Sequence, residues 1–334
     1  MNFRTSVELP SKEAQIKVSD KILFLGSCFA NNIGKRMQQF KFDNDVNPFG
    51  VIYNPISIVS VLEVLYRKAY LNEELPEHYL FEAHGVWRSW IHSTLFGACD
   101  KTLFRKQIEE QIAHTAERLK HLDVLFITLG TNHRYILKQE NITVTNCHKQ
   151  PSSWFVEEET SVSLIVESFE GVLRKIRAEN PTLRIIFTIS PYRYAKFGAH
   201  GNQLSKATLL LAVNALCTNP SFACSYFPAY EIVNDELRDY RFYAEDMLHP
   251  SQQAIDYIWE RFSECYFDAT TKEFLHEWET IQKAIAHEPF CPKSVTYRAF
   301  LVKIMLKIDA LREKYPNLAV QNELEELKHK IELQ

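Results

Sequence analysis

The chain has 334 residues and a formal charge of −4, with 38 lysines and arginines against 42 aspartates and glutamates. Hydrophobic residues make up 46% and charged residues 24%, a balance that excludes a disordered or membrane-embedded protein and is typical of a folded one. No long basic tract accompanies the aromatic residues, so nucleic acid is not expected as a partner.

The cysteines and the N-terminal segment indicate in which cellular compartment the protein is expected. Seven cysteines are scattered without paired spacing, which favours reduced thiols over a disulfide framework. The first 20 residues hold no apolar core of a signal peptide, and no run of ~20 apolar residues follows. We expect a cytoplasmic protein that does not bind membranes, although a chain trimmed of its signal would look the same.

Short apolar runs alternate with helical periodicities along most of the chain. The pattern predicts strands at 22–25, 123–129, 183–189 and 222–227, and helices at 30–40, 55–66, 101–120, 162–179 and 204–216. Residues 77–97 fit a hairpin or a long connection, and 134–144 an inserted hairpin. This alternation is typical of a doubly wound α/β domain, because parallel strands need helical crossovers on both faces of the sheet.

Beyond residue 255 the pattern is almost wholly helical. The last two helices, separated at residues 315–317, are typical of an αα-hairpin. We expect an α/β domain over residues 1–267 and a helical C-terminal extension over 268–334. The extension is expected to pack on the core or to join subunits of a homo-oligomer.

The polar candidate residues share one position, just beyond the carboxyl end of a predicted strand: Ser27, Gly50, Gly130 with Asn132, Ser190, and Asp246 with His249. Open α/β sheets bind ligands at this edge. A carboxylate three residues before a histidine can orient the imidazole as a general base, and a serine hydroxyl needs such a base to attack. Together Ser27, His249 and Asp246 predict a serine acyl-ester hydrolase without metal or organic cofactor.

Each of these residues also has a simpler interpretation. Ser27 alone is a helix N-cap, and Asp246 alone is a cap beside a surface histidine. The expected oxyanion donors are the N–H groups of Ser27 and Gly50 and the side-chain amide of Asn132, although NPFG and LGTN are also ordinary turn sequences.

Other chemistries fit the sequence less well. Cys28 is an alternative nucleophile, because a thiol near a helix N-terminus can have a lowered pKa, but the position after a nucleophile usually packs beneath the turn. GSCFANNIGKR imitates a phosphate loop, yet Phe29 stands at the first glycine position and Arg36 where Ser or Thr must follow Lys35. Cys147-His148 has no second ligand pair, so no metal site is predicted.

Several cations are candidates for substrate binding, where they would favour a carboxylate, phosphate or sulfate. The alternative for each is a surface salt bridge. His92 lies with Trp87 and Trp90 in a connection that would cover the site or join the core. The candidates are Arg193, Arg241, His92 and Lys149, with Lys206 and Arg238 in the same group.

At these positions the chain resembles the GSCFA-domain proteins, which are related to the SGNH (GDSL-like) hydrolases. The resemblance rests on Gly26-Ser27-Cys28-Phe29-Ala30 and on NPFGVIYNP, TLGT, NCHK, SPYR, LSKA and YFPAYEIVNDELRDYRFYAEDMLHP, over about residues 20–260. It implies a three-layer α/β/α, flavodoxin-like fold, a triad of Ser27, Asp246 and His249, and an oxyanion hole with Gly50 and Asn132. The Gly-Asp-Ser and Gly-x-Asn-Asp motifs of SGNH enzymes appear here as Leu25-Gly-Ser and Gly130-Thr-Asn-His, without their bracing acids.

The sequence therefore predicts a hydrolase of small acyl esters that forms an acyl-enzyme on Ser27. An acylated carbohydrate or an anionic metabolite is the expected substrate, and an acyltransferase would use the same triad. The alternative class is a non-catalytic binding or scaffold protein on a hydrolase fold, assembled through its C-terminal helices.

Overall fold

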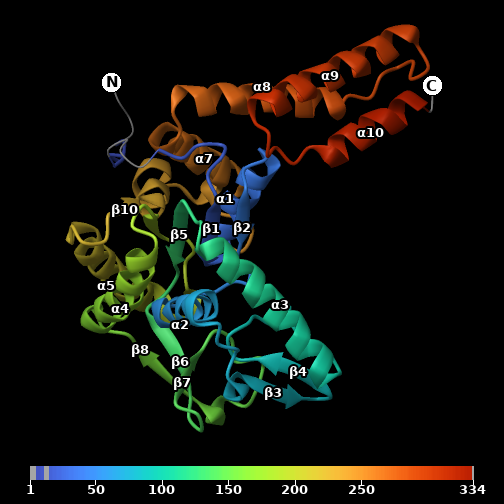
Figure 1. Cartoon of the computed structure of the whole chain (residues 1–334). Coiled ribbons are helices and arrows are strands. Elements are labelled where there is room, and N and C mark those ends of the chain that lie inside the picture. The colour runs from blue at the N-terminus through green and yellow to red at the C-terminus, as the bar shows by residue number, and fades with distance from the viewer. Residues whose placement is uncertain (1–4, 11–14, 333–334) are drawn as a thin grey trace.

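Five parallel strands form the central sheet of the computed structural model, which describes residues 5–10 and 15–332 (Figure 1). They are β1 (Ile22–Gly26), β2 (Asn44–Val46), β5 (Val124–Leu129), β9 (Arg184–Ile189) and β10 (Cys224–Phe227). The strand order β10-β9-β5-β1-β2 is the flavodoxin-like order 2-1-3-4-5 when the strands are counted along the chain. The predicted α/β fold is confirmed.

Helices cover both faces of this sheet, because successive side chains of each strand point to opposite faces. Phe24 and Phe126 pack on one face with α1 (Cys28–Gln39) and α7 (Gln252–Tyr266). Leu23 and Leu125 pack on the other face, which is covered by α2 (Pro55–Tyr66), α3 (Lys101–Leu119), α4 (Val162–Glu179) and α5 (Gly198–Thr218). The strands read as almost continuous apolar runs because both of their faces are buried.

Polar caps set where these helices begin. The side chains of Ser27, Asn54, Asp100 and Ser161 each accept a hydrogen bond from a backbone N–H in the first turn of the following helix. The helices predicted at 55–66 and 162–179 match the structure to the residue. Shorter helical turns lie at Arg67–Leu71, Glu77–Tyr79, Ser152–Trp154, Ala195–Phe197, Ala229–Glu231, Ile232–Leu237 and Tyr240–Phe242.

Two small antiparallel sheets accompany the central one. The predicted hairpins are β3 (Leu80–Ala83) with β4 (Val86–Ser89), and β6 (His133–Leu137) with β7 (Ile142–Val144). A third strand, β8 (Phe155–Glu159), pairs with β6 and was not predicted. Its last three residues are glutamates, so it lacks the apolar alternation of a half-buried strand, and an Arg134–Glu158 ion pair joins it to β6 instead.

The C-terminal extension consists of α8 (Ala269–Ile285), α9 (Val295–Lys314) and α10 (Gln321–Glu332), which project from the sheet domain (Figure 1). The predicted break near Pro316 falls between α9 and α10. The Trp278 ring is buried and its Nε1 donates to the Gln39 carbonyl at the end of α1, 2.8 Å away. The apolar cluster of α1 and α7 continues without interruption through α8, α9 and α10.

The outermost residues of the two expected domains, 1–4 and 333–334, lie outside the described part of the chain. Among the helices that the structure describes, none combines the length and apolar character needed to span a membrane.

Candidate active site

Ser27 lies between β1 and α1, at the point where the strand order reverses between β1 and β5. Its Oγ accepts the N–H of Phe29 at 3.3 Å as the N-cap of α1, and its own N–H donates to the Thr128 carbonyl at 3.1 Å. The residue has no exposed surface. Ligands of doubly wound sheets bind at this switch point, so the predicted nucleophile has the expected place in the fold.

The Asp246–His249 turn holds a carboxylate against an imidazole. Asp246 Oδ2 lies 2.5 Å from His249 Nδ1, while Oδ1 accepts the N–H groups of Leu248 and His249, each at 2.9 Å. The His249 N–H, the imidazole and the Leu248 N–H lower the pKa of Asp246 to about 2. One carboxylate oxygen therefore fixes the turn and the other orients the ring through Nδ1.

This depressed pKa gives a direct test of the pair. Asp246 is ionised above pH about 2 and loses its hydrogen bonds as the pH falls through that value. In the His249→Ala variant the imidazole bond is lost, so the carboxyl titration followed by ¹³C NMR is expected to move upward. It should stay below the ordinary value, because two backbone N–H groups remain. An unmoved midpoint in His249→Ala would show that the ring contributes nothing, and His276→Ala on α8 is the control.

Two contacts join this turn to the loop that follows β9, at the edge of the sheet where Ser27 lies. The His249 ring contacts Tyr192, with ring centroids 4.3 Å apart, and the Arg193 N–H donates to the Leu248 carbonyl at 3.1 Å. Burial raises the pKa of the Cys28 thiol, and weaker electrostatic effects on the same thiol come from Lys206, which lowers it, and Asp246, which raises it. Within the described residues no hydrogen bond joins Ser27 Oγ to His249.

The raised pKa of Cys28 also bears on the alternative nucleophile. A thiol attacks as the thiolate, and burial makes the thiolate of Cys28 harder to form. Cys28, the first residue of α1, is therefore a less favourable nucleophile than its pKa in water would suggest, and the neighbouring Ser27 hydroxyl remains the candidate.

The three expected oxyanion donors each have an acceptor within the chain. The Ser27 N–H is bonded to Thr128, the Gly50 N–H donates to the Asn47 carbonyl at 2.7 Å, and the Asn132 amide donates to the Thr160 carbonyl at 3.3 Å. Gly50 has φ 83°, and a Cβ there would lie 2.0 Å from Ser93 Oγ, so glycine is required for the turn itself. An oxyanion bound here would have to share these donors with their present carbonyl acceptors or displace the carbonyls.

His92, a candidate for substrate binding, is fully buried in the core. Its ring stacks on Phe49, with centroids 4.7 Å apart, and its nitrogens lie 3.0 Å from Ser89 Oγ and 3.3 Å from Gln111 Oε1. Burial lowers the pKa of His92 to about 4, so the ring stays neutral near pH 7. The structure thus gives His92 a packing role and does not bring it to the site.

Three of the candidate cations, Arg193, Arg241 and Lys149, lie in different places. Arg193 is half-buried beside the Asp246 turn, with its guanidinium over the rings of Tyr240 and Tyr243 at 5.8 and 5.4 Å. It lines a cavity of about 230 Å³ that also includes Arg238. The Arg241 and Lys149 side chains are exposed, and Arg241 lies 3.9 Å from Asp239. Of the three, Arg193 is the one with a direct link to the His249 turn.

Aromatic residues that the sequence did not single out surround the site. Tyr53 and Tyr194 meet edge to face, with ring centroids 6.1 Å apart, and burial raises the pKa of both hydroxyls. They line a cavity of about 330 Å³ together with Phe197, Asn54 and Asn146. Tyr192 and Tyr194 belong to the SPYR segment and its continuation, which was the available signal, but nothing in the sequence showed which rings meet.

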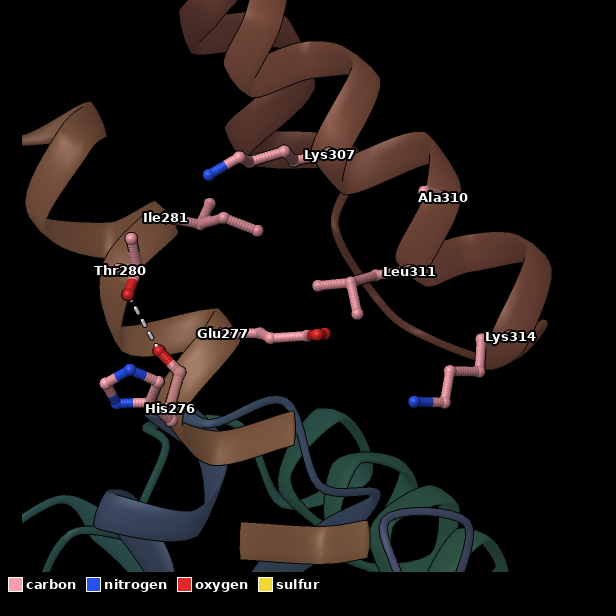
Figure 2. A pocket seen from close by; sticks show the side chains of 8 residues that line it. All are labelled: His276, Glu277, Thr280, Ile281, Lys307, Ala310, Leu311 and Lys314. Carbon is pink, nitrogen blue, oxygen red and sulfur yellow. Dashed lines mark hydrogen bonds between the residues drawn. The ribbon is translucent and has the colours of Figure 1, made fainter. Parts of the chain in front are cut away.

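A separate cavity of about 370 Å³ lies between α8 and α9 (Figure 2). Its lining includes Ile281, Leu311 and the charged side chains of Glu277, Lys307 and Lys314, and it belongs to the C-terminal extension, outside the candidate site. In residues 5–10 and 15–332 no group of three or more His, Cys, Asp or Glu side chains is arranged to hold a metal ion.

Two family models match the chain. The model of the GSCFA family covers residues 21–262, and that of the GSCFA domain protein, C-terminal domain, covers residues 278–333. The chain belongs to the GSCFA family. The boundary between the two matched segments of this GSCFA protein falls in the region where α7 ends and α8 begins.

Two solved structures are similar to part of this GSCFA protein. One is an acetyl esterase mutant with an acetate ion, at 14% identity, and the other is a carbohydrate esterase family 3 from Talaromyces cellulolyticus, at 12%. Each likeness covers 47% of this chain and 60% of the other chain, with a TM-score of 0.27. The chain thus spans less than two thirds of either. No curated protein sequence matches it.

Proposed function

We propose that this GSCFA protein is a serine acyl-ester hydrolase with Ser27 as nucleophile, His249 as general base and Asp246 as the carboxylate that orients it. The observation that carries the proposal is the 2.5 Å contact between Asp246 Oδ2 and His249 Nδ1. The turn that carries this pair is bonded to the loop after β9 through the Arg193 N–H and the Leu248 carbonyl. Ser27 follows β1 at the same edge of the sheet. The order nucleophile, carboxylate, histidine and their roles fit acyl transfer.

The proposed reaction has two steps. Ser27 Oγ forms a bond to the acyl carbon of an ester while its proton passes to His249 Nε2, and the ester C–O bond then breaks as His249 returns the proton to the departing alcohol. Water repeats the sequence on the acyl-enzyme, which releases a carboxylic acid and restores the Ser27 hydroxyl. With an acceptor alcohol in place of water, the same residues would perform acyl transfer.

The proposal requires a change at Ser27. Its hydroxyl must come within hydrogen-bond reach of His249 Nε2, about 2.6–3.2 Å, and donate to it, which would loosen the bond from the Phe29 N–H. Catalytic hydrogen bonds often tighten only when substrate binds, and a weak cap bond of 3.3 Å is a small barrier to that movement.

The cavity beside Tyr53 and Tyr194 favours a neutral alcohol as leaving group. Lys196 on its lining is bonded to both carboxylate oxygens of Glu157, each at 2.8 Å, so its charge is already paired. Aromatic rings and the amide of Asn146 suit a hydroxylated ring. We therefore propose an acylated carbohydrate as substrate, with an anionic metabolite as second choice because of Arg193.

The seven free cysteines support a cytoplasmic location.

The test is covalent labelling. A fluorophosphonate probe is expected to modify wild-type protein at Ser27, as mapped by peptide mass spectrometry, and to leave Ser27→Ala unmodified. Ser168→Ala, which alters a half-buried serine on α4 away from the candidate site, is the matched control and should label normally. Absence of an adduct on Ser27, together with unchanged turnover of an activated acetate ester by Ser27→Ala, would reject the proposal.

One observation favours a second function, a non-catalytic binding protein on the same fold. Ser27 has no exposed surface and its Oγ serves as the cap of α1. In that case neither labelling nor turnover would occur, and the C-terminal helices would supply the contacts for assembly.

A further inference from the structure

A buried lysine lies directly beneath the candidate site. Lys206 on α5 is 1% exposed, and its Nζ donates to the carbonyls of Gly130 and Ser190, each at 2.7 Å. These two residues come immediately after β5 and β9, which are neighbouring strands. In the described part of the chain no carboxylate lies within ion-pair distance of this ammonium group.

Burying a cation without a carboxylate is unfavourable, because the charge loses its hydration. Burial accordingly lowers the pKa of Lys206 to about 7, and the interaction that opposes this shift is with Cys28. The rings of Tyr194 and Tyr230 lie 5.2 and 5.7 Å from Nζ and supply further, weaker attraction. With this pKa the charged and neutral forms of Lys206 are both present near pH 7, and either form can donate to the two carbonyls, so only the charged form adds positive potential.

The two carbonyls belong to opposite sides of the site. Gly130 follows Thr128 by two residues, and the Thr128 carbonyl accepts the N–H of Ser27. Ser190 precedes Tyr192 by two residues, and the Tyr192 ring contacts His249. Lys206 therefore joins the loop beside the nucleophile to the loop beside the base.

We propose that Lys206 is a positioning residue of this site, which holds the Gly130 and Ser190 loops at a fixed separation and supplies positive potential to the developing oxyanion. The inference rests on the proposed hydrolase function. The N–H groups of Ser27 and Gly50 and one N–H of the Asn132 amide are engaged within the chain, so the charge of protonated Lys206 would compensate for weak N–H donation.

Three substitutions separate the charge from the hydrogen bonds. Lys206→Gln keeps a donor but removes the charge, Lys206→Met removes both, and Lys206→Arg keeps the charge. We expect kcat for an activated acetate ester, per mole of folded protein, to fall about 100-fold in Lys206→Gln with KM changed less than about twofold. Lys206→Arg should retain more activity than Lys206→Gln. The control is Lys283→Gln, a lysine with a 73% exposed side chain on α8, away from the candidate site.

The pH profile supplies a readout that a packing role would not move. As the pH rises through about 7, Lys206 loses its charge, so the wild-type kcat should fall, whereas Lys206→Arg stays charged and should not show this fall. The facing groups Cys28, Tyr194 and Tyr230 have raised pKa values and stay neutral across this range.

The outcomes separate this inference from the proposed function. A wild-type protein that neither labels at Ser27 nor turns over the ester overturns both. An active wild type whose Lys206→Gln variant keeps its kcat, or whose alkaline fall persists in Lys206→Arg, overturns the role of Lys206 alone. Circular dichroism and active-site titration with the probe give the folded fraction of each variant, so a loss of folding is not counted as a loss of kcat.

Discussion

His249→Ala is expected to lower kcat for an activated acetate ester by about 10³-fold or more, with little change in KM, because a serine hydroxyl without a base is a poor nucleophile. His249 lies on a half-exposed turn whose backbone is held by Asp246 Oδ1 rather than by the imidazole. Removing the ring should therefore leave the fold intact. Steady-state kinetics with thermal unfolding of the same samples measures both quantities.

Asp246→Asn and His276→Ala complete the comparison. The amide introduced by Asp246→Asn would still accept backbone N–H bonds but could not stabilise an imidazolium, so kcat should fall by at least about 100-fold. His276 is exposed on α8, in the C-terminal extension, and its replacement should change nothing. If His249→Ala retained wild-type kcat while Ser27→Ala did not, another group would be the base.

Gly26→Ala is expected to destabilise the protein by about 3 kcal/mol or more, which is the largest effect on stability that we predict for a one-carbon change. Gly26 has φ 136°, and a Cβ there would lie 2.1 Å from the Thr128 carbonyl oxygen, in the centre of the sheet. Backbone on β1 or β5 would have to shift, since neither partner is a flexible side chain. Urea denaturation followed by circular dichroism gives the change in the free energy of unfolding.

Gly171→Ala is the matched control. Gly171 is exposed within α4, where an added Cβ meets no atom within 4 Å and φ is ordinary, so alanine should stabilise the helix by about 0.5–1 kcal/mol. The two substitutions are chemically identical and are expected to shift the urea midpoint in opposite directions. A Gly26→Ala variant as stable as wild type would mean that the β1–β5 pairing at Thr128 differs from the one described.

The sequence predicted the central fold well because its signals there are local. Apolar runs such as 123–129 are long enough to mark buried strands, and Asn54 and Ser161 mark helix starts through capping chemistry that depends on adjacent residues. β2 and β8 were missed for the same reason. The sequence Asn44–Val46 has three residues and no apolar run, and β8 carries three glutamates whose pairing with β6 is set by tertiary contact.

The sequence predicted the pairing of Asp246 with His249 in the candidate site, but not the other hydrogen bonds there. The Asp246–His249 contact follows from a spacing of three residues, whereas the engagement of Gly50 and Asn132 depends on carbonyls that only the folded chain brings near. For two other polar residues, the folded structure and not the sequence shows which part each one plays. His92 and Lys206 are polar residues of similar prominence in the sequence, yet one is part of the core and the other bridges two loops at the site.

The contact between Trp278 and Gln39 gives the C-terminal helices a connection to the nucleophile. Gln39 is the last residue of α1, and its carbonyl accepts from both Trp278 and Gln282 of α8. The same helix begins directly after Ser27, which caps it. The twelve-residue helix α1 is thus bonded to the C-terminal extension at its last residue and capped by Ser27 at its first turn. A change in the tilt of α8 would therefore be passed along α1 to the position of Ser27.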